Sequence, residues 1–157
     1  MSATLESRAV IVGDVRVGDG PAVVLGDAAT PLLEPPADDA GDAAGAAGLL
    51  VWSARAAEGA GAAAATGLPL VVRRSPSATL EEWLEAADRY AAAAGGRVIL
   101  CETAFDLVLV RAARARGPYP VAVDVSADPG LSRAAVAAGA GGLVLSPRRR
   151  YGRRTRP

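Results

Sequence analysis

Four charged side chains stand at the ends of apolar runs of the kind that form buried strands: Arg55, Arg73, Arg74 and Glu102. The carboxyl ends of neighbouring parallel strands meet at one edge of a sheet, so we expect Arg55, Arg73 and Glu102 to lie close together there. Two or three converging guanidinium groups could bind a phosphate group. The plainer interpretation is that the arginines are solvated strand-end charges. Glu102 could belong to such a site, or it could form an ion pair with Arg73 or Arg74.

The composition excludes several kinds of chemistry. The chain has no histidine, which removes the commonest general base and the commonest ligand for transition metals. Its single cysteine, Cys101, ends an apolar run, and we expect it to be a small core residue in a reducing compartment. The first residues lack the pattern of a signal peptide, and no uncharged apolar run is long enough for a membrane span. We therefore expect a cytoplasmic protein.

Charge is distributed unevenly along the chain. Residues 1–147 carry 11 arginines against 17 acidic side chains, whereas residues 148–157 carry six arginines and no acid. We expect residues 148–157 to form a disordered, solubilising tail. Docking of this tail on an acidic surface and weak, nonspecific binding to nucleic acid are the alternatives.

The order of the elements indicates a parallel α/β sheet. Residues 8–18 predict a small hairpin, and residues 27–46, rich in Pro, Ala, Gly and acids, predict a linker. Six apolar runs predict buried strands at residues 22–25, 48–52, 69–73, 97–101, 120–124 and 142–145. Helices are expected between most of them, at residues 56–66, 80–94, 104–115 and 130–138. Alternating strands and helices are typical of a parallel sheet covered by helices.

Several stretches together resemble the short-type 3-deoxy-7-phosphoheptulonate (DAHP) synthase family. The stretches are AGLLVWSARA at 47–56, LPLVVRRSPSATLEEWLEAADRY at 68–90, GGRVILCE at 95–102 and PVAVDVSADPGLSRAAVAAGAGGLVL at 120–145. EEWL followed by VILCE is the most specific pairing. The resemblance implies an aldolase-type TIM-barrel derivative with about six parallel βα units and an N-terminal hairpin, in one domain over residues 1–147. Two βα units of the family are apparently missing between Gly26 and Ala47.

The metal-ligand positions of the family do not carry metal ligands in this chain. The family holds a divalent metal with a Cys, a His, a Glu and an Asp. The resemblance places Ala28, Ala127 and Ser146 at the first three of these positions, and the fourth has no match. A methyl group has no lone pair for a metal. We therefore expect no metal, no cofactor and no catalytic residue of the family's reaction.

The family's phosphoenolpyruvate site is matched better than its metal site. Arg55 matches an arginine of that site, Arg73 replaces a lysine, and the arginine that follows the VILCE motif is replaced by Thr103. The resemblance therefore implies a residual site for a substrate or anion, formed by Arg55, Arg73, Arg74 and Glu102.

Different classes of function fit these features. The main hypothesis is a catalytically inactive pseudoenzyme that binds a small phosphorylated anion or a protein partner, either a second copy of the chain or a full-length synthase. Strand edges left by the missing units would favour self-association. The alternative is a residual or altered enzyme of the phosphoenolpyruvate aldol-condensation class, which serves aromatic amino-acid biosynthesis. A gene product without a selected activity is the third hypothesis.

Overall fold

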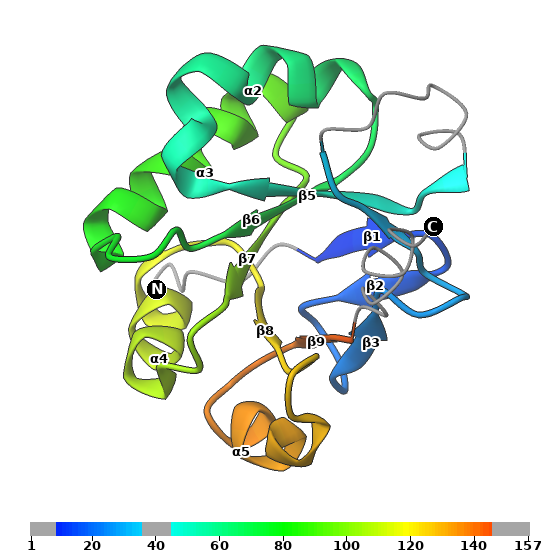
Figure 1. Ribbon diagram of the computed structural model, residues 1–157, viewed down its shortest axis with the longest axis vertical. Coiled ribbons are helices and arrows are strands. Elements are labelled where there is room, and N and C mark those ends of the chain that lie inside the picture. Colours follow the sequence, from blue (N-terminus) through cyan, green and yellow to red (C-terminus); the bar gives the residue numbers. More distant parts are fainter. Residues whose placement is uncertain (1–8, 36–44, 146–157) are drawn as a thin grey trace, which may run out of the picture.

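The main sheet of this protein is a parallel barrel that is nearly closed (Figure 1). The structure is a computed structural model that describes residues 9–35 and 45–145. The strands lie in the order β3-β9-β8-β7-β6-β5-β4, and every neighbouring pair is parallel. Their bounds are β3 (Val23–Leu25), β4 (Leu32–Leu33), β5 (Gly48–Trp52), β6 (Leu70–Arg73), β7 (Val98–Glu102), β8 (Val121–Asp124) and β9 (Gly142–Val144). This arrangement confirms the predicted fold class.

The sheet has seven strands, one more than the six expected. The additional strand, β4, lies inside the predicted linker 27–46 and pairs with the start of β5. Its two residues, Leu32 and Leu33, lie between Pro31 and Pro35 and are too few to give a periodic signal. Residues 36–44 of that linker lie outside the described residues, as does the predicted tail at 148–157.

The helices cover the outside of the barrel (Figure 1). They are α2 (Ala56–Ala65), α3 (Leu80–Ala94), α4 (Leu107–Arg116) and α5 (Ser132–Ala137), with short 3-10 turns at η1 (Ser53–Arg55) and η2 (Pro129–Leu131). Helix α3 begins with a capping box, in which the Thr79 hydroxyl accepts from the Glu82 amide and the Glu82 carboxylate accepts from the Thr79 amide. It ends at Gly95, which adopts the left-handed conformation (φ 69°). In the described part of the chain, no helix is both long and apolar enough to cross a membrane.

Two apolar clusters hold the fold together. The outer cluster lies between the sheet and the helices and includes Trp83 and Tyr90, which are almost completely buried. The inner cluster fills the barrel and includes Leu50, Val71 and Ile99. The predicted hairpin, β1 (Val10–Val12) with β2 (Val15–Val17), packs its valines onto this inner cluster. Since Val12 and Val17 lie beside Gly48 and Gly142, the first residues of β5 and β9, the hairpin closes the amino end of the barrel.

Candidate functional site

The alternation of side chains along each strand decides which charged residues face the barrel interior. Leu50 and Val71 belong to the inner cluster, and Trp52 and Arg73 follow them two residues later on the same strands. Because successive side chains point to opposite faces of a strand, Trp52 and Arg73 both face inward at the carboxyl end of the barrel. They are also register partners on neighbouring strands. We call this end of the barrel the mouth.

Arg73 is held at the mouth by two contacts. Its Nη1 atom donates to Glu34 Oε2 at 2.9 Å, and its guanidinium carbon lies 4.0 Å from the centroid of the Trp52 ring. The Arg73 side chain is 8% exposed and that of Glu34 is 36% exposed. A partly buried cation stacked on an indole ring gains roughly 0.5–2 kcal/mol. The Nε atom of Arg73 is buried and has no hydrogen-bond partner among the described residues, so one donor of this cation is unsatisfied.

Neither Glu34 nor the position of Trp52 was evident in the sequence. Glu34 lies within the predicted linker, 39 residues before Arg73. Trp52 ends the run 48–52 that was predicted to form a buried strand, but it is half-buried and forms the wall against which Arg73 stacks. The signal that could have revealed Glu34 is its place directly after the apolar dipeptide Leu32-Leu33. Two residues are short for a strand, so this signal is weak.

Arg74 and Glu102 lie on the outer face of the sheet. Each follows an outer-cluster residue, Val72 or Leu100, by two positions on its strand. The carboxylate of Glu102 is completely buried and accepts from Arg74 Nε at 2.7 Å and from Arg74 Nη2 at 2.9 Å. The hydrogen bond to Glu102 raises the pKa of Arg74. Of the sequence-based alternatives for Glu102, the ion pair with Arg74 is therefore present.

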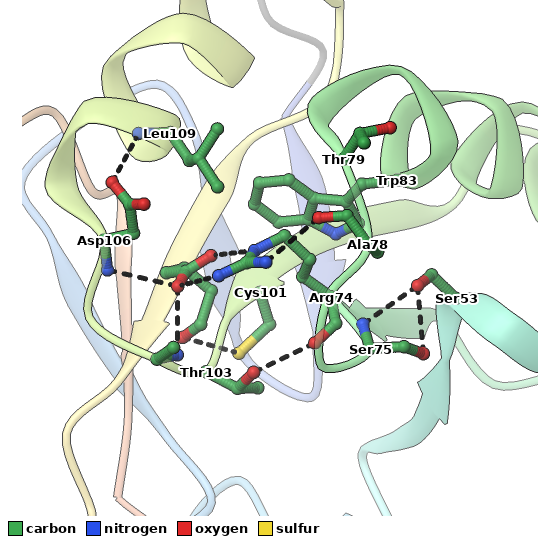
Figure 2. Close-up of polar contacts among 12 residues, drawn as sticks. Ser53, Arg74, Ser75, Ala78, Thr79, Trp83, Cys101, Thr103, Asp106 and Leu109 are labelled. Atoms are coloured by element: carbon green, nitrogen blue, oxygen red, sulfur yellow. Dashed lines mark hydrogen bonds and ion pairs between the residues drawn. The ribbon is translucent and has the colours of Figure 1, made fainter.

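The pair between Arg74 and Glu102 joins two loops (Figure 2). Arg74 Nη1 donates to the Ala78 carbonyl at 3.0 Å, just before α3. Glu102 Oε2 also accepts from the amides of Ala104 and Asp106 at 2.9 and 3.1 Å, just before α4. Every strong donor around this carboxylate is thus internal to the protein, which fits a structural role better than ligand binding.

Arg55 is a member of neither ion pair. It ends the η1 turn after β5 and is exposed. Arg55, Arg73 and Glu102 lie at or just after the carboxyl ends of β5, β6 and β7, as expected. The four predicted residues nevertheless do not share one face of the sheet. Arg73 faces inward, Arg74 and Glu102 face outward, and Arg55 is at the surface.

Two serines tie the ends of β5 and β6 together (Figure 2). The Ser53 hydroxyl accepts from the Ser75 amide at 2.9 Å. The Ser75 hydroxyl in turn accepts from the Ala54 amide at 2.8 Å. A surface cavity of about 310 Å³ adjoins them and is lined partly by Ser77 and Glu82. These amides lie at the carboxyl ends of strands, where a phosphate could be bound, but they already have internal acceptors.

The two metal-ligand positions of the resemblance that fall within the described residues are occupied by alanines. Ala28 and Ala127 are exposed in the loops after β3 and β8, and Ser146 lies outside the described residues. No group of three His, Cys, Asp or Glu side chains within residues 9–35 and 45–145 is placed to hold a metal ion. Asp124 faces the interior at the end of β8, where it accepts from the Ser126 amide at 2.9 Å.

Cys101 faces the barrel interior, where it is the register partner of Arg73. It is completely buried, and burial is the main cause that raises the pKa of its thiol far above the ordinary value, with the charge of Asp124 as a further cause. A thiol that stays protonated is a poor nucleophile. This result agrees with the expectation that Cys101 is a core residue.

Comparison with known proteins finds similarity at the level of structure. No family model matches the chain, and no curated protein matches it in sequence. A truncated form of 3-deoxy-D-arabino-heptulosonate 7-phosphate synthase from Thermotoga maritima superimposes with a TM-score of 0.72 at 21% identity, covering 88% of this chain and 79% of that one. A phospho-2-dehydro-3-deoxyheptonate aldolase (DAHP synthase) from the same organism superimposes with a TM-score of 0.74 at 19% identity, covering 90% of this chain and 64% of that one. This chain therefore has the barrel fold of the DAHP synthases, as its sequence motifs predicted.

Proposed function

We propose that this chain is a catalytically inactive protein of DAHP synthase fold that binds a small phosphorylated anion at the barrel mouth. The observation that supports this proposal is Arg73, a buried guanidinium stacked on Trp52 with its Nε atom unpaired. Its single anionic partner among the described residues, Glu34, is partly exposed. A phosphate group could accept from Nη1 of Arg73 in place of the Glu34 carboxylate.

The lack of catalysis is inferred from the residues at the reacting positions. Ala28 and Ala127 stand where the family has metal ligands, and neither offers a lone pair to a metal. The thiol of Cys101 is buried and protonated. Since a fold by itself does not carry an activity, the similarity to DAHP synthases is compatible with the loss of the condensation reaction.

Binding of an anion is favoured over self-association through strand edges. The free edge of β3 is partly covered by its own loop, because the Thr30 hydroxyl donates to the Val24 carbonyl at 3.1 Å. Thr30 itself is buried, and its carbonyl accepts from the Gly26 amide at 2.7 Å. A strand edge whose backbone groups are engaged is a poor template for pairing with another chain.

The first test of this proposal is an assay for the condensation of phosphoenolpyruvate with a sugar phosphate, with each of several divalent metals. We expect no heptulonate product above a control without enzyme. Metal-dependent product from protein free of host synthase would contradict the proposal and support the residual enzyme.

The second test is thermal unfolding with phosphate or phosphoenolpyruvate. A dissociation constant on the order of a millimolar is expected for one buried arginine, so ten millimolar ligand would add about 1.4 kcal/mol of stability, a shift of a few degrees. Arg73→Met should abolish the shift, whereas Arg116→Met, at an exposed arginine of α4, should preserve it. Arg55→Met measures whether the exposed arginine beside the mouth contributes.

The arginine-rich segment 148–157 needs a control of its own, because it could also bind phosphate. Its deletion should leave the shift unchanged if the anion binds at Arg73. If the deletion removes the shift while Arg73→Met does not, the mouth binds no anion, and binding of a protein partner becomes the better proposal.

A further inference from the structure

We infer that Glu34 determines the anion affinity of the mouth, because its carboxylate occupies the guanidinium of Arg73 and competes there with a phosphorylated ligand. This inference rests on the proposed function and names the residue that regulates the same site. In the resting protein, Glu34 neutralises the Arg73 charge at a distance of 2.9 Å.

The strand geometry aims Glu34 into the barrel. It directly follows β4, in which Leu32 packs on the inner cluster and Leu33 on the outer cluster. The alternation of side chains therefore turns Glu34 to the inner face, on the same side as Leu32. Strand β5 separates β4 from β6, and Glu34 reaches across it to Arg73 beside the Trp52 ring.

The contact between Glu34 and Arg73 is weaker in form than the other arginine–carboxylate pair near the mouth. Glu34 offers one oxygen to one nitrogen and is 36% exposed, whereas Glu102 accepts from two nitrogens of Arg74 and is completely buried. Glu34 is also carried by a strand of two residues that is bonded to only one neighbour in the described sheet. Its carboxylate can therefore leave Arg73 for water at a modest cost, which is not possible for Glu102.

An anion that takes the place of Glu34 keeps the charge of Arg73 compensated. It also leaves the stacking of Arg73 on Trp52 intact. A phosphate or phosphate ester, with several oxygens around one centre, compensates the charge of Arg73 better than the single oxygen that Glu34 offers. The observed anion affinity is then the intrinsic affinity of Arg73 multiplied by the fraction of molecules in which Glu34 has left the Arg73 guanidinium.

The experiment compares phosphate and phosphoenolpyruvate binding to the full chain by calorimetric titration. Glu34→Gln removes the competing charge and should tighten binding on the order of tenfold, the worth of one charge-assisted contact. Glu34→Asp retracts the carboxylate by one methylene and should tighten binding in the same direction by less. Glu81→Gln is the matched control, because Glu81 forms an exposed ion pair with Arg116 at 3.5 Å; it should bind like the unaltered protein.

The double variant Glu34→Gln with Arg73→Met separates the inference from the proposed function. We expect it to lose the gained affinity. If Arg73→Met abolishes binding but neither Glu34 variant binds more tightly than the unaltered protein, the role of Glu34 is wrong and the anion site stands. If binding does not depend on Arg73, both the site and the role of Glu34 are wrong. Circular dichroism and thermal unfolding verify that each variant is folded.

Discussion

Replacement of Glu102 by Gln should destabilise this protein strongly. The Glu102 carboxylate is completely buried and accepts four hydrogen bonds, two from Arg74 and one each from the amides of Ala104 and Asp106. The variant leaves the Arg74 guanidinium, whose side chain is 10% exposed, without its paired carboxylate. Removing one partner of a buried ion pair costs roughly 3–5 kcal/mol, and the carboxamide retains one acceptor, so the lower figure applies. For a chain of this size, about 3 kcal/mol corresponds to a fall in Tm of roughly 6–12 °C.

Chemical denaturation monitored by circular dichroism measures this change in the free energy of unfolding. Glu81→Gln is again the matched control, since its pair with Arg116 is exposed on both sides and should contribute less than about 0.5 kcal/mol. Arg74→Met and the double variant complete a cycle, and the two single losses should exceed the double loss by more than about 1 kcal/mol. Equal effects of Glu102→Gln and Glu81→Gln, or additive losses in the cycle, would refute the reasoning.

Three further predictions concern other parts of the fold. Cys101 should react slowly with a thiol reagent until the chain is unfolded, because it is buried. Burial also raises the pKa of the folded thiol above the ordinary 9.0. The stability that the neutral thiol contributes is therefore full below that pH and is lost above it. Cys101→Ala should therefore flatten the decline of Tm above pH 9.0, and equal slopes would show that the thiol is not responsible. Ser77→Gly should stabilise by about 0.5–1 kcal/mol, because Ser77 has a left-handed backbone (φ 70°), whereas Ser132→Gly in α5 should destabilise; a loss at Ser77 would contradict this. Thr79→Ala should cost about 1 kcal/mol of unfolding free energy, and Thr79→Ser, which keeps the capping hydroxyl, should cost much less.

The local elements of this fold could be predicted because their signals lie within a few residues. The capping box at Thr79 and the glycine at Gly95 define α3 from within the segment itself. The continuous apolar runs that became β5 to β9 indicated strands buried on both faces, and hence a parallel sheet. The motif order that resembled DAHP synthases agrees with the structural similarity at 19–21% identity.

The candidate site was only partly evident in the sequence. Arg55, Arg73 and Glu102 were correctly placed at the carboxyl ends of successive strands, since each follows or ends an apolar run. The face of the sheet to which each points was not predicted. Strand β4 and its following residue Glu34 were assigned to a linker, because two leucines between prolines carry no periodicity.

The sequence by itself therefore determined the helices, every strand except β4, their order and the edge of the sheet at which the charged residues lie. Only the tertiary structure decided that Arg73 faces the barrel while Arg74, its neighbour in the chain, faces the helices. The physical reason is that the pleat turns adjacent side chains to opposite faces, and which face is inside depends on packing against the hairpin and the helices. The partners Glu34 and Glu102, 39 and 28 residues away from their arginines, are likewise chosen by strand order and register, which no local pattern encodes.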